Sequence, residues 1–184
     1  MENENQNVPV LEESYDSLFV KSLYAALKSG KSGIFKLKRS LGLDISADMS
    51  AYMSFMDIVG GSGIPYPFLR KYESIYFFIA CLFYFFEKGD SNKVPVTAET
   101  LLGRLYQNVQ TSESIKNRIV NLIDTENAGE VIFQKKLLGL LRLCKDQKRA
   151  EESLNYVYLI NALRRWDNED KMVRKNWAKK IALN

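Results

Sequence analysis

One apolar segment restricts the fold of this chain more than any other feature. Residues 74–86 read SIYFFIACLFYFF, thirteen consecutive residues without a charge. A helix that crosses a membrane needs about twenty such residues. The polar run Glu87-Lys88-Gly89-Asp90 follows at once. We therefore predict a helix that is buried on nearly all sides within a folded protein, and we expect no contact with a membrane.

The rest of the chain repeats apolar residues at spacings of three and four, which is typical of helices. Only four prolines and ten glycines interrupt the 184 residues, and alternation typical of strands is missing throughout. The sequence therefore predicts an all-α protein. The expected helices span about 14–29, 34–41, 50–59, 66–88, 98–109, 113–124, 130–146, 151–166 and 169–183.

The turn-forming run GDSNKVP at 89–95 is the best internal boundary. It predicts two small helical bundles packed in tandem, an N-terminal one at 13–92 and a C-terminal one at 96–184. Residues 1–12 are polar and lack periodicity, so we expect a disordered tail. Trp166 and Trp177 are expected to pack in the core between the last two helices.

The balance of basic and acidic residues changes close to the same boundary. Residues 1–100 hold ten Lys and Arg against twelve Asp and Glu, whereas residues 101–184 hold sixteen against ten. The C-terminal bundle is therefore expected to have a basic surface, and such asymmetry points to an anionic partner. Basic helix faces also keep proteins soluble, so simple solvation stays open as the other interpretation.

The composition argues against an enzyme. The chain has no histidine, which excludes Ser-His-Asp and Cys-His catalysis and His-ligated zinc. Cys81 and Cys144 lack Cys-x-x-Cys spacing and lie in apolar helical stretches, so we expect two buried thiols. We expect no catalytic residue, no metal ligand and no cofactor. The polar, acidic N-terminus does not resemble a secretory signal, which favours the cytoplasm.

Basic residues recur along the predicted C-terminal helices. Lys135 and Lys136, for example, are expected on the side of helix 130–146 that faces away from Ile132, Leu137 and Leu141. If two or three helices align, their basic sides would form a channel about as wide as a phosphate backbone. Such a channel would hold nucleic acid without reading its sequence.

The C-terminal half resembles a known family. The segments LLGRLYQN, IKNRIVNLID, FQKKLLGLLRL and YLINALRRWDNEDKMVRKNWAKKIAL follow one another over residues 100–183. In order and approximate spacing they are similar to the CasB family, the small subunit of the type I-E CRISPR Cascade surveillance complex. The N-terminal half is similar in outline, with Arg70 before an apolar helix that contains Cys81-Leu82.

The resemblance implies a prokaryotic, non-catalytic subunit that dimerises along Cascade and helps to hold the target and displaced DNA strands of the R-loop. Its implied partners are the repeated backbone subunit, the large subunit, a second copy of itself, R-loop DNA and the guide RNA. Family positions fall on Arg70, Arg118 and Lys136, with Lys135 and Arg104 close by. The predicted nucleic-acid-binding residues are Arg70, Arg104, Arg118, Lys135, Lys136, Arg164, Lys171 and Arg174.

The chain departs from the family pattern at four positions, because Asp124, Glu126, Asn168 and Glu169 stand where relatives can be basic. Lys171 and Arg174 are expected to compensate one turn later. Two alternatives stay open: a helical adaptor or scaffold that contacts only proteins, and a regulator that reads duplex DNA. The second would need a short-turn helix pair that enters the major groove, which the sequence does not suggest.

Overall fold

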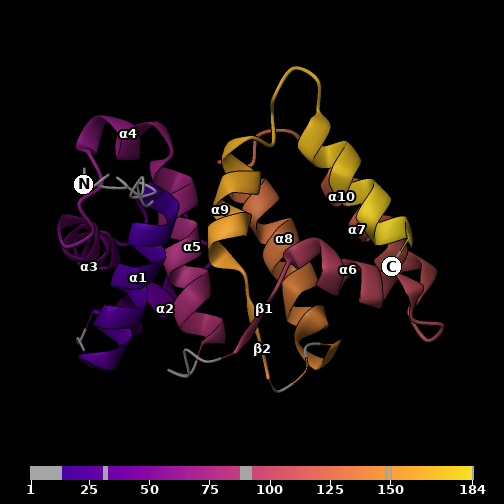
Figure 1. The fold of residues 1–184 in the computed structure, drawn as a ribbon, viewed down its shortest axis with the longest axis horizontal. Coiled ribbons are helices and arrows are strands. Elements are labelled where there is room, and N and C mark those ends of the chain that lie inside the picture. Colours follow the sequence, from indigo (N-terminus) through magenta and orange to yellow (C-terminus); the bar gives the residue numbers. More distant parts are fainter. Residues whose placement is uncertain (1–13, 31–32, 88–92, 148, 150, 184) are drawn as a thin grey trace, which may run out of the picture.

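The computed structural model describes residues 14–30, 33–87, 93–147, 149 and 151–183. Two groups of helices lie side by side along the long axis of the molecule (Figure 1). The predicted all-α class is confirmed. The tail predicted at 1–12 and most of the boundary at 89–95 lie outside the described residues. The N-terminal group comprises α1 (Tyr15–Lys28), α2 (Ile34–Arg39), α3 (Met49–Gly60), α4 (Tyr66–Lys71) and α5 (Glu73–Phe86).

Side-chain caps fix where two of these helices begin. The Ser14 hydroxyl accepts a hydrogen bond from the Ser17 backbone N–H at 3.3 Å, at the start of α1. The Asp48 carboxylate accepts from the backbone N–H groups of Ser50 and Ala51, both at 3.1 Å, at the start of α3. Each cap satisfies backbone donors that have no partner within the helix.

The α5 helix forms the centre of the N-terminal group. Ten consecutive residues, 75–84, are buried, as the uncharged sequence predicts. Aromatic side chains pack against it edge-on, with Phe19 of α1 at 4.9 Å from Tyr76 and Phe55 of α3 at 5.5 Å from Phe77, between ring centroids. Such pairs add about 0.5–1.5 kcal/mol each beyond the burial of apolar surface.

The C-terminal group is built around a second aromatic cluster. Trp166 lies 5.0 Å from both Phe133 and Trp177, between ring centroids, and both tryptophans are fully buried. The predicted packing of the two tryptophans in the core is confirmed. The elements of this group are β1 (Val94–Val96), α6 (Ala98–Gln107), α7 (Glu113–Asp124), α8 (Val131–Leu143), η1 (Cys144–Gln147), β2 (Glu152–Leu154), α9 (Tyr156–Arg164) and α10 (Met172–Leu183).

Three details of the helix prediction are wrong. The helix expected at 151–166 begins as strand β2, which pairs in parallel with β1 so that Val94 lies opposite Glu152. Strands of three residues are too short to show alternation in sequence. The helix expected at 66–88 divides into α4 and α5 at Tyr72, whose φ of −127° is not helical. Ile132 is 63% exposed and does not belong to the apolar face of α8.

Helix α9 joins the two groups. It belongs to the C-terminal half of the sequence but packs against α1 and α5. The Tyr156 hydroxyl at its start donates a hydrogen bond to Glu87 Oε1 at 3.0 Å, immediately after α5. The two groups therefore share a seam, which we define as the contact of α9 with α1, α4 and α5.

Both cysteines are buried, as the sequence predicts. Burial raises the pKa of the Cys144 thiol to about 12, and it raises the pKa of Cys81 as well. A thiol that stays protonated is a poor nucleophile and a poor metal ligand. The two cysteines therefore act as small apolar residues of the core.

Candidate nucleic-acid interface

The eight predicted nucleic-acid-binding residues do not lie together. Arg104, Arg164 and Arg174 form ion pairs with carboxylates of the chain, and Lys171 faces a carboxylate at the surface. The other four, Arg70, Arg118, Lys135 and Lys136, are exposed. The eight residues therefore fall into two classes, those that face a carboxylate of the chain and those that are exposed.

Arg104 joins α6 to strand β2. Its Nη1 and Nη2 donate to Glu152 Oε2 and Oε1 at 2.8 and 2.9 Å, a two-point contact. The side chain of Glu152 is only 8% exposed, and Oε2 also accepts from the Arg149 backbone N–H at 3.0 Å. The hydrogen bonds from Arg104 hold the pKa of Glu152 at about 2, well below its ordinary value. Arg104 thus fixes the position of β2.

Arg164 holds α9 against the N-terminal group. Its Nη1 lies 3.0 Å from Asp16 Oδ1 of α1, and the Tyr76 hydroxyl of α5 donates to the same oxygen at 2.5 Å. The guanidinium also stacks over two rings, 4.9 Å from the centroid of Phe68 and 5.1 Å from that of Tyr72. Arg164 is therefore the central side chain of the seam.

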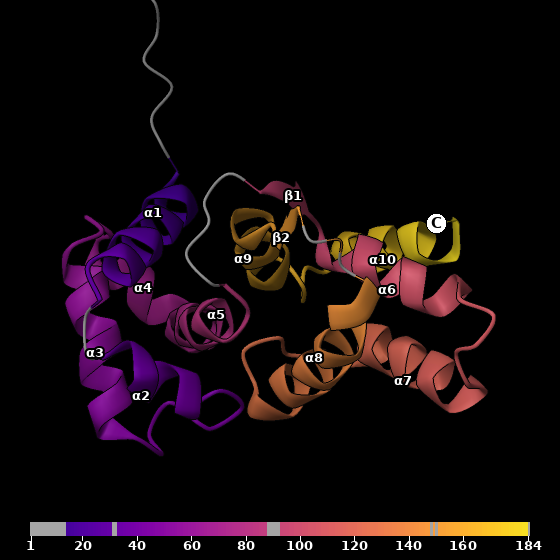
Figure 2. The same cartoon turned by 90° about the horizontal axis from the view of Figure 1, so that it is seen from below.

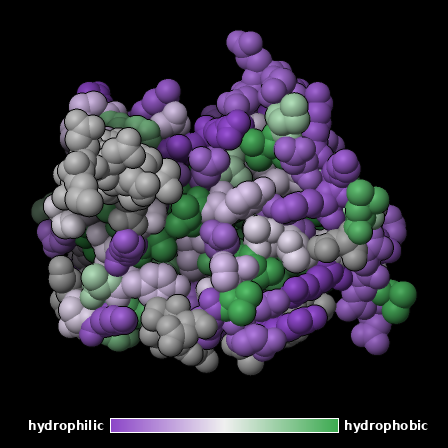
Figure 3. All heavy atoms as spheres, viewed as in Figure 1, coloured by the Kyte–Doolittle hydropathy of each residue, from purple (hydrophilic) through white to green (hydrophobic). Residues whose placement is uncertain are grey.

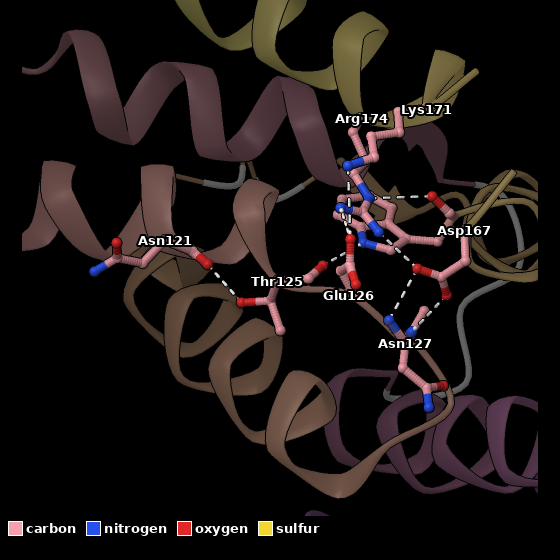
Figure 4. A network of polar contacts seen from close by, with 9 residues as sticks. Asn121, Thr125, Glu126, Asn127, Asp167, Lys171 and Arg174 are labelled. Atoms are coloured by element: carbon pink, nitrogen blue, oxygen red, sulfur yellow. Dashed lines mark hydrogen bonds and ion pairs between the residues drawn. The ribbon is translucent and has the colours of Figure 1, made fainter. Parts of the chain in front are cut away.

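Arg174 and Lys171 belong to a polar network between the turn after α7 and the turn before α10 (Figure 4). Arg174 Nη2 lies 2.7 Å from Asp167 Oδ1, and its Nε donates to the Trp166 carbonyl at 3.2 Å. Glu126 lies 3.7 Å from Arg174 and 3.6 Å from Lys171, measured between charged atoms. The two basic residues that were expected to extend the basic surface therefore face an acidic residue of the chain itself.

The same network closes the turn between α7 and α8. The Asp167 carboxylate accepts from the backbone N–H groups of Asn127 and Ala128, at 2.9 and 3.2 Å (Figure 4). Asn127 has a φ of 58°, a left-handed conformation that asparagine tolerates better than most residues. The buried indole of Trp166 donates to the Thr125 carbonyl at 2.8 Å. These contacts fix α7 relative to α8.

The exposed basic residues of the C-terminal group meet on α7 and α8. Arg118 of α7 reaches across to α8, where its Nη2 lies 3.0 Å from the position that a Cβ at Gly139 would take. Lys136 Nζ donates to Thr125 Oγ1 at 2.8 Å, at the end of α7. Helical spacing places Lys135 and Arg142, both exposed, on the same side of α8. We call Arg118, Lys135, Lys136 and Arg142 the α7–α8 basic face.

One member of this face, Arg142, was not among the predicted residues. Arg142 follows Lys135 by seven residues and Gly139 by three, so helical periodicity alone is sufficient to place it on the basic face. Its guanidinium lies 5.1 Å from the ring centroid of Phe85 at the end of α5, which orients it. Gly139 contributes by leaving room for Arg118. Arg70 is exposed and belongs to α4. Figure 1 shows this helix in the N-terminal group, apart from α7 and α8.

Within the described residues, no group of three or more Cys, Asp or Glu side chains is placed to hold a metal ion. Over the same part of the chain, every helix is too short or too polar to span a membrane. The chemistry available at the α7–α8 basic face is the attraction of exposed cationic groups for an anionic backbone.

Comparison with known proteins shows that this fold also occurs in a protein of known structure. A chain of a solved structure described as a CRISPR RNA-guided surveillance complex shares it, with a TM-score of 0.60 at 16% sequence identity, over 91% of each chain. No curated protein matches the sequence. The family described as CRISPR-associated protein Cse2 matches residues 36–180, from α2 into α10. Because this match spans most of the sequence, the chain belongs to the Cse2 family of CRISPR-associated proteins, in agreement with its predicted resemblance to the CasB small subunits.

Proposed function

We propose that this protein is a non-catalytic subunit of a type I-E Cascade surveillance complex in the prokaryotic cytoplasm. In this role it holds DNA strands of the R-loop through contacts to phosphates that do not depend on sequence. The family match supports the assignment to a CRISPR complex. The observation that carries the nucleic-acid role is the α7–α8 basic face, where basic side chains of two helices are exposed together.

The geometry supports some of the predicted basic residues as phosphate-binding residues more than others. Arg118, Lys135 and Lys136 form no ion pair with any described residue, so their charge is available to an anionic partner. Arg104, Arg164 and Arg174 already donate to carboxylates. We therefore assign phosphate binding to the first three together with Arg142, and positioning of the helices to the second three. Arg70 is a separate contact on the N-terminal group.

A few phosphate contacts suffice for this function. Formation of an R-loop exchanges a DNA duplex for a heteroduplex of similar stability, so contacts from the protein to the strand backbone shift the balance. Each basic side chain on the α7–α8 basic face adds to that shift without reading a base. Three or four exposed cations are therefore enough to stabilise the R-loop.

Exposed apolar side chains support contacts with other proteins. Phe35 of α2 is 72% exposed, and Met49 and Met53 of α3 are 62% and 58% exposed. Met49 and Met53 are one turn apart, so they share one side of α3. We propose that this part of the N-terminal group meets a second copy of the chain or another Cascade subunit. A helical adaptor that binds only proteins is the alternative function that these residues favour.

The test is the affinity for labelled single-stranded DNA, measured by fluorescence anisotropy across a salt series. Each phosphate contact contributes about −0.7 to the slope of log affinity against log salt for a single strand. We expect Arg118→Glu with Lys136→Glu to weaken binding and to make the slope shallower by about 1.4. The matched control is Lys28→Glu with Lys38→Glu, two exposed lysines of the N-terminal group with the same change in net charge.

The two double variants distinguish a local interface from bulk charge. A loss confined to the α7–α8 variant supports the proposal. Equal losses in both would mean that net charge alone attracts DNA. Unchanged binding in both, with unchanged circular dichroism, would reject the phosphate-binding role and favour the adaptor.

A further inference from the structure

A hollow of about 140 Å³ lies between α9 and α10, apart from the α7–α8 basic face. Tyr158, Asn161 and Arg165 line it from α9 and its C-terminal end, and Asn176 and Trp177 line it from α10. It has no carboxylate in its lining. We propose that this hollow binds one unpaired nucleobase of a DNA strand, an inference that rests on the proposed nucleic-acid role.

The two asparagines supply the hydrogen-bonding groups. Asn161 and Asn176 are both exposed and come from the two opposite walls of the hollow. A primary amide offers two donor hydrogens and an acceptor oxygen, which match the polar edge of a base. An amide on each side can pair with a base without any charge, whereas Arg165, which also lines the hollow, would meet the phosphate beside that base.

Tyr158 supplies an aromatic surface that is already fixed in place. Tyr158 as a residue is 38% exposed. Partial burial and the hydrogen bond from its hydroxyl to the buried Glu99 raise the pKa of Tyr158 to about 12, so the hydroxyl stays a donor. Lys180 Nζ lies 2.9 Å from Glu99 Oε1 and 5.4 Å from the Tyr158 ring centroid. Bases stack on such rings without strong sequence preference.

Trp177 adds a donor that lacks an acceptor. Its indole is fully buried, and Nε1 has no hydrogen-bond partner among the described residues. A buried donor without an acceptor is unfavourable in a folded protein. Because Nε1 is closed off from solvent, a base in the hollow can supply this acceptor only after the lining side chains move apart.

The position of the hollow suits a second strand. Figures 1 and 2 together show α9 and α10 on one face of the molecule and α7 and α8 on the other. Hydrophilic side chains cover α10 on the face seen in Figure 3. An open groove between α1 and α9 adjoins the hollow and shares Tyr158 and Asn161 with it. A strand can therefore reach the hollow along this groove while another lies on the α7–α8 basic face.

The experiment compares two probes that carry the same phosphates, using the full chain. One is an oligothymidylate of about eight nucleotides, and the other is an abasic oligomer of equal length. We expect the full chain to bind the oligothymidylate about tenfold more tightly, because the abasic oligomer lacks both the ring that stacks and the base edge that bonds to the two amides. Asn161→Ala with Asn176→Ala should reduce the preference to about twofold and leave the affinity for the abasic oligomer unchanged.

Asn117→Ala with Asn121→Ala is the matched control, because both residues are exposed asparagines on α7. Alanine favours helices, so neither double variant should unfold. Equal affinity for the two probes, or an equal effect of the two double variants, would overturn the hollow as a base site. The proposed function would still stand if Arg118→Glu with Lys136→Glu weakens binding of both probes. Failure of both probes to bind at low salt would overturn both proposals.

Discussion

Arginines of the seam and of the α7–α8 basic face have the same chemistry but opposite surroundings. Arg164 lies over two aromatic rings with a buried carboxylate at 3.0 Å. Arg118 is exposed, and its guanidinium rests over a glycine. A guanidinium that is desolvated and paired holds helices together, whereas one that stays in water is available to a partner. A basic residue that has a carboxylate of the fold within reach is therefore paired with it, and one that has none is exposed to solvent.

The comparison predicts that the seam arginine matters for stability. Arg164→Ala leaves Asp16, whose side chain is 5% exposed, without its cationic partner. We expect the free energy of unfolding to fall by about 3 kcal/mol, the loss typical when one member of a buried pair is removed. Urea denaturation of both proteins measures this difference.

Arg118→Ala is the control for that change. It removes an exposed arginine of the same size, and we expect its unfolding free energy to stay within about 0.5 kcal/mol of the wild-type value. A similar loss of unfolding free energy in the two variants would show that the arginines of the seam and of the basic face do not differ in their contribution to stability.

A second prediction concerns the pH dependence of the ion pair between Arg104 and Glu152. The pKa of Glu152 is held at about 2 in the folded state, below its ordinary value of 4.5. A lowered pKa contributes stability above about pH 4.5, and this contribution is lost as the pH falls from 4.5 towards 2. Arg104→Gln should therefore cost about 2 kcal/mol of unfolding free energy at pH 7 and little near pH 2.

Comparison with Lys136→Gln isolates this effect from the other acids that titrate in the same range. Lys136 bonds only to the hydroxyl of Thr125 among the described residues, so the stability difference between this variant and the wild type should not change with pH. If the stability difference between Arg104→Gln and the wild type likewise does not change with pH, Arg104 does not stabilise the charged form of Glu152.

The fold could be predicted from the sequence where neighbours along the chain decide the structure. The uncharged run of α5 leaves no side that tolerates water, so burial of residues 75–84 follows from local composition. Strands β1 and β2 could not be predicted in this way. Val94 and Glu152 face each other across a stretch of chain that holds α6, α7, α8 and η1, and neither strand has a local pattern.

In the candidate site, too, contacts between residues far apart in the chain could not be predicted from the local sequence. Arg164 pairs with Asp16, a residue 148 positions away, and helical periodicity carries no information about that partner. For Arg174 a signal was present, because Arg174, Trp177 and Ile181 follow one another at spacings of three and four and are all buried. This signal is not specific, because Arg118 likewise follows Ile115 by three residues and precedes Leu122 by four, yet its side chain is exposed.

The smallest expected effect concerns Gly139, which allows Arg118 to approach α8. A Cβ at this position would lie 3.0 Å from Arg118 Nη2, so Gly139→Ala displaces the end of a flexible side chain by a few tenths of an ångström. Alanine is favoured over glycine by about 1 kcal/mol within a helix, so the fold should be retained or slightly stabilised. We expect the affinity for single-stranded DNA to fall about twofold, because the Arg118 guanidinium is displaced from its position on the basic face.

A double-mutant cycle separates these two consequences of the added methyl group. In an Arg118→Ala background, Gly139→Ala has no guanidinium to displace, so it should stabilise the helix by the full ~1 kcal/mol and leave DNA affinity unchanged. The same twofold loss in both backgrounds would mean that Gly139 itself, and not the placement of Arg118, contributes to binding. Because the two backgrounds differ in one exposed side chain, the cycle tests directly whether the α7–α8 basic face depends on where its arginine is held.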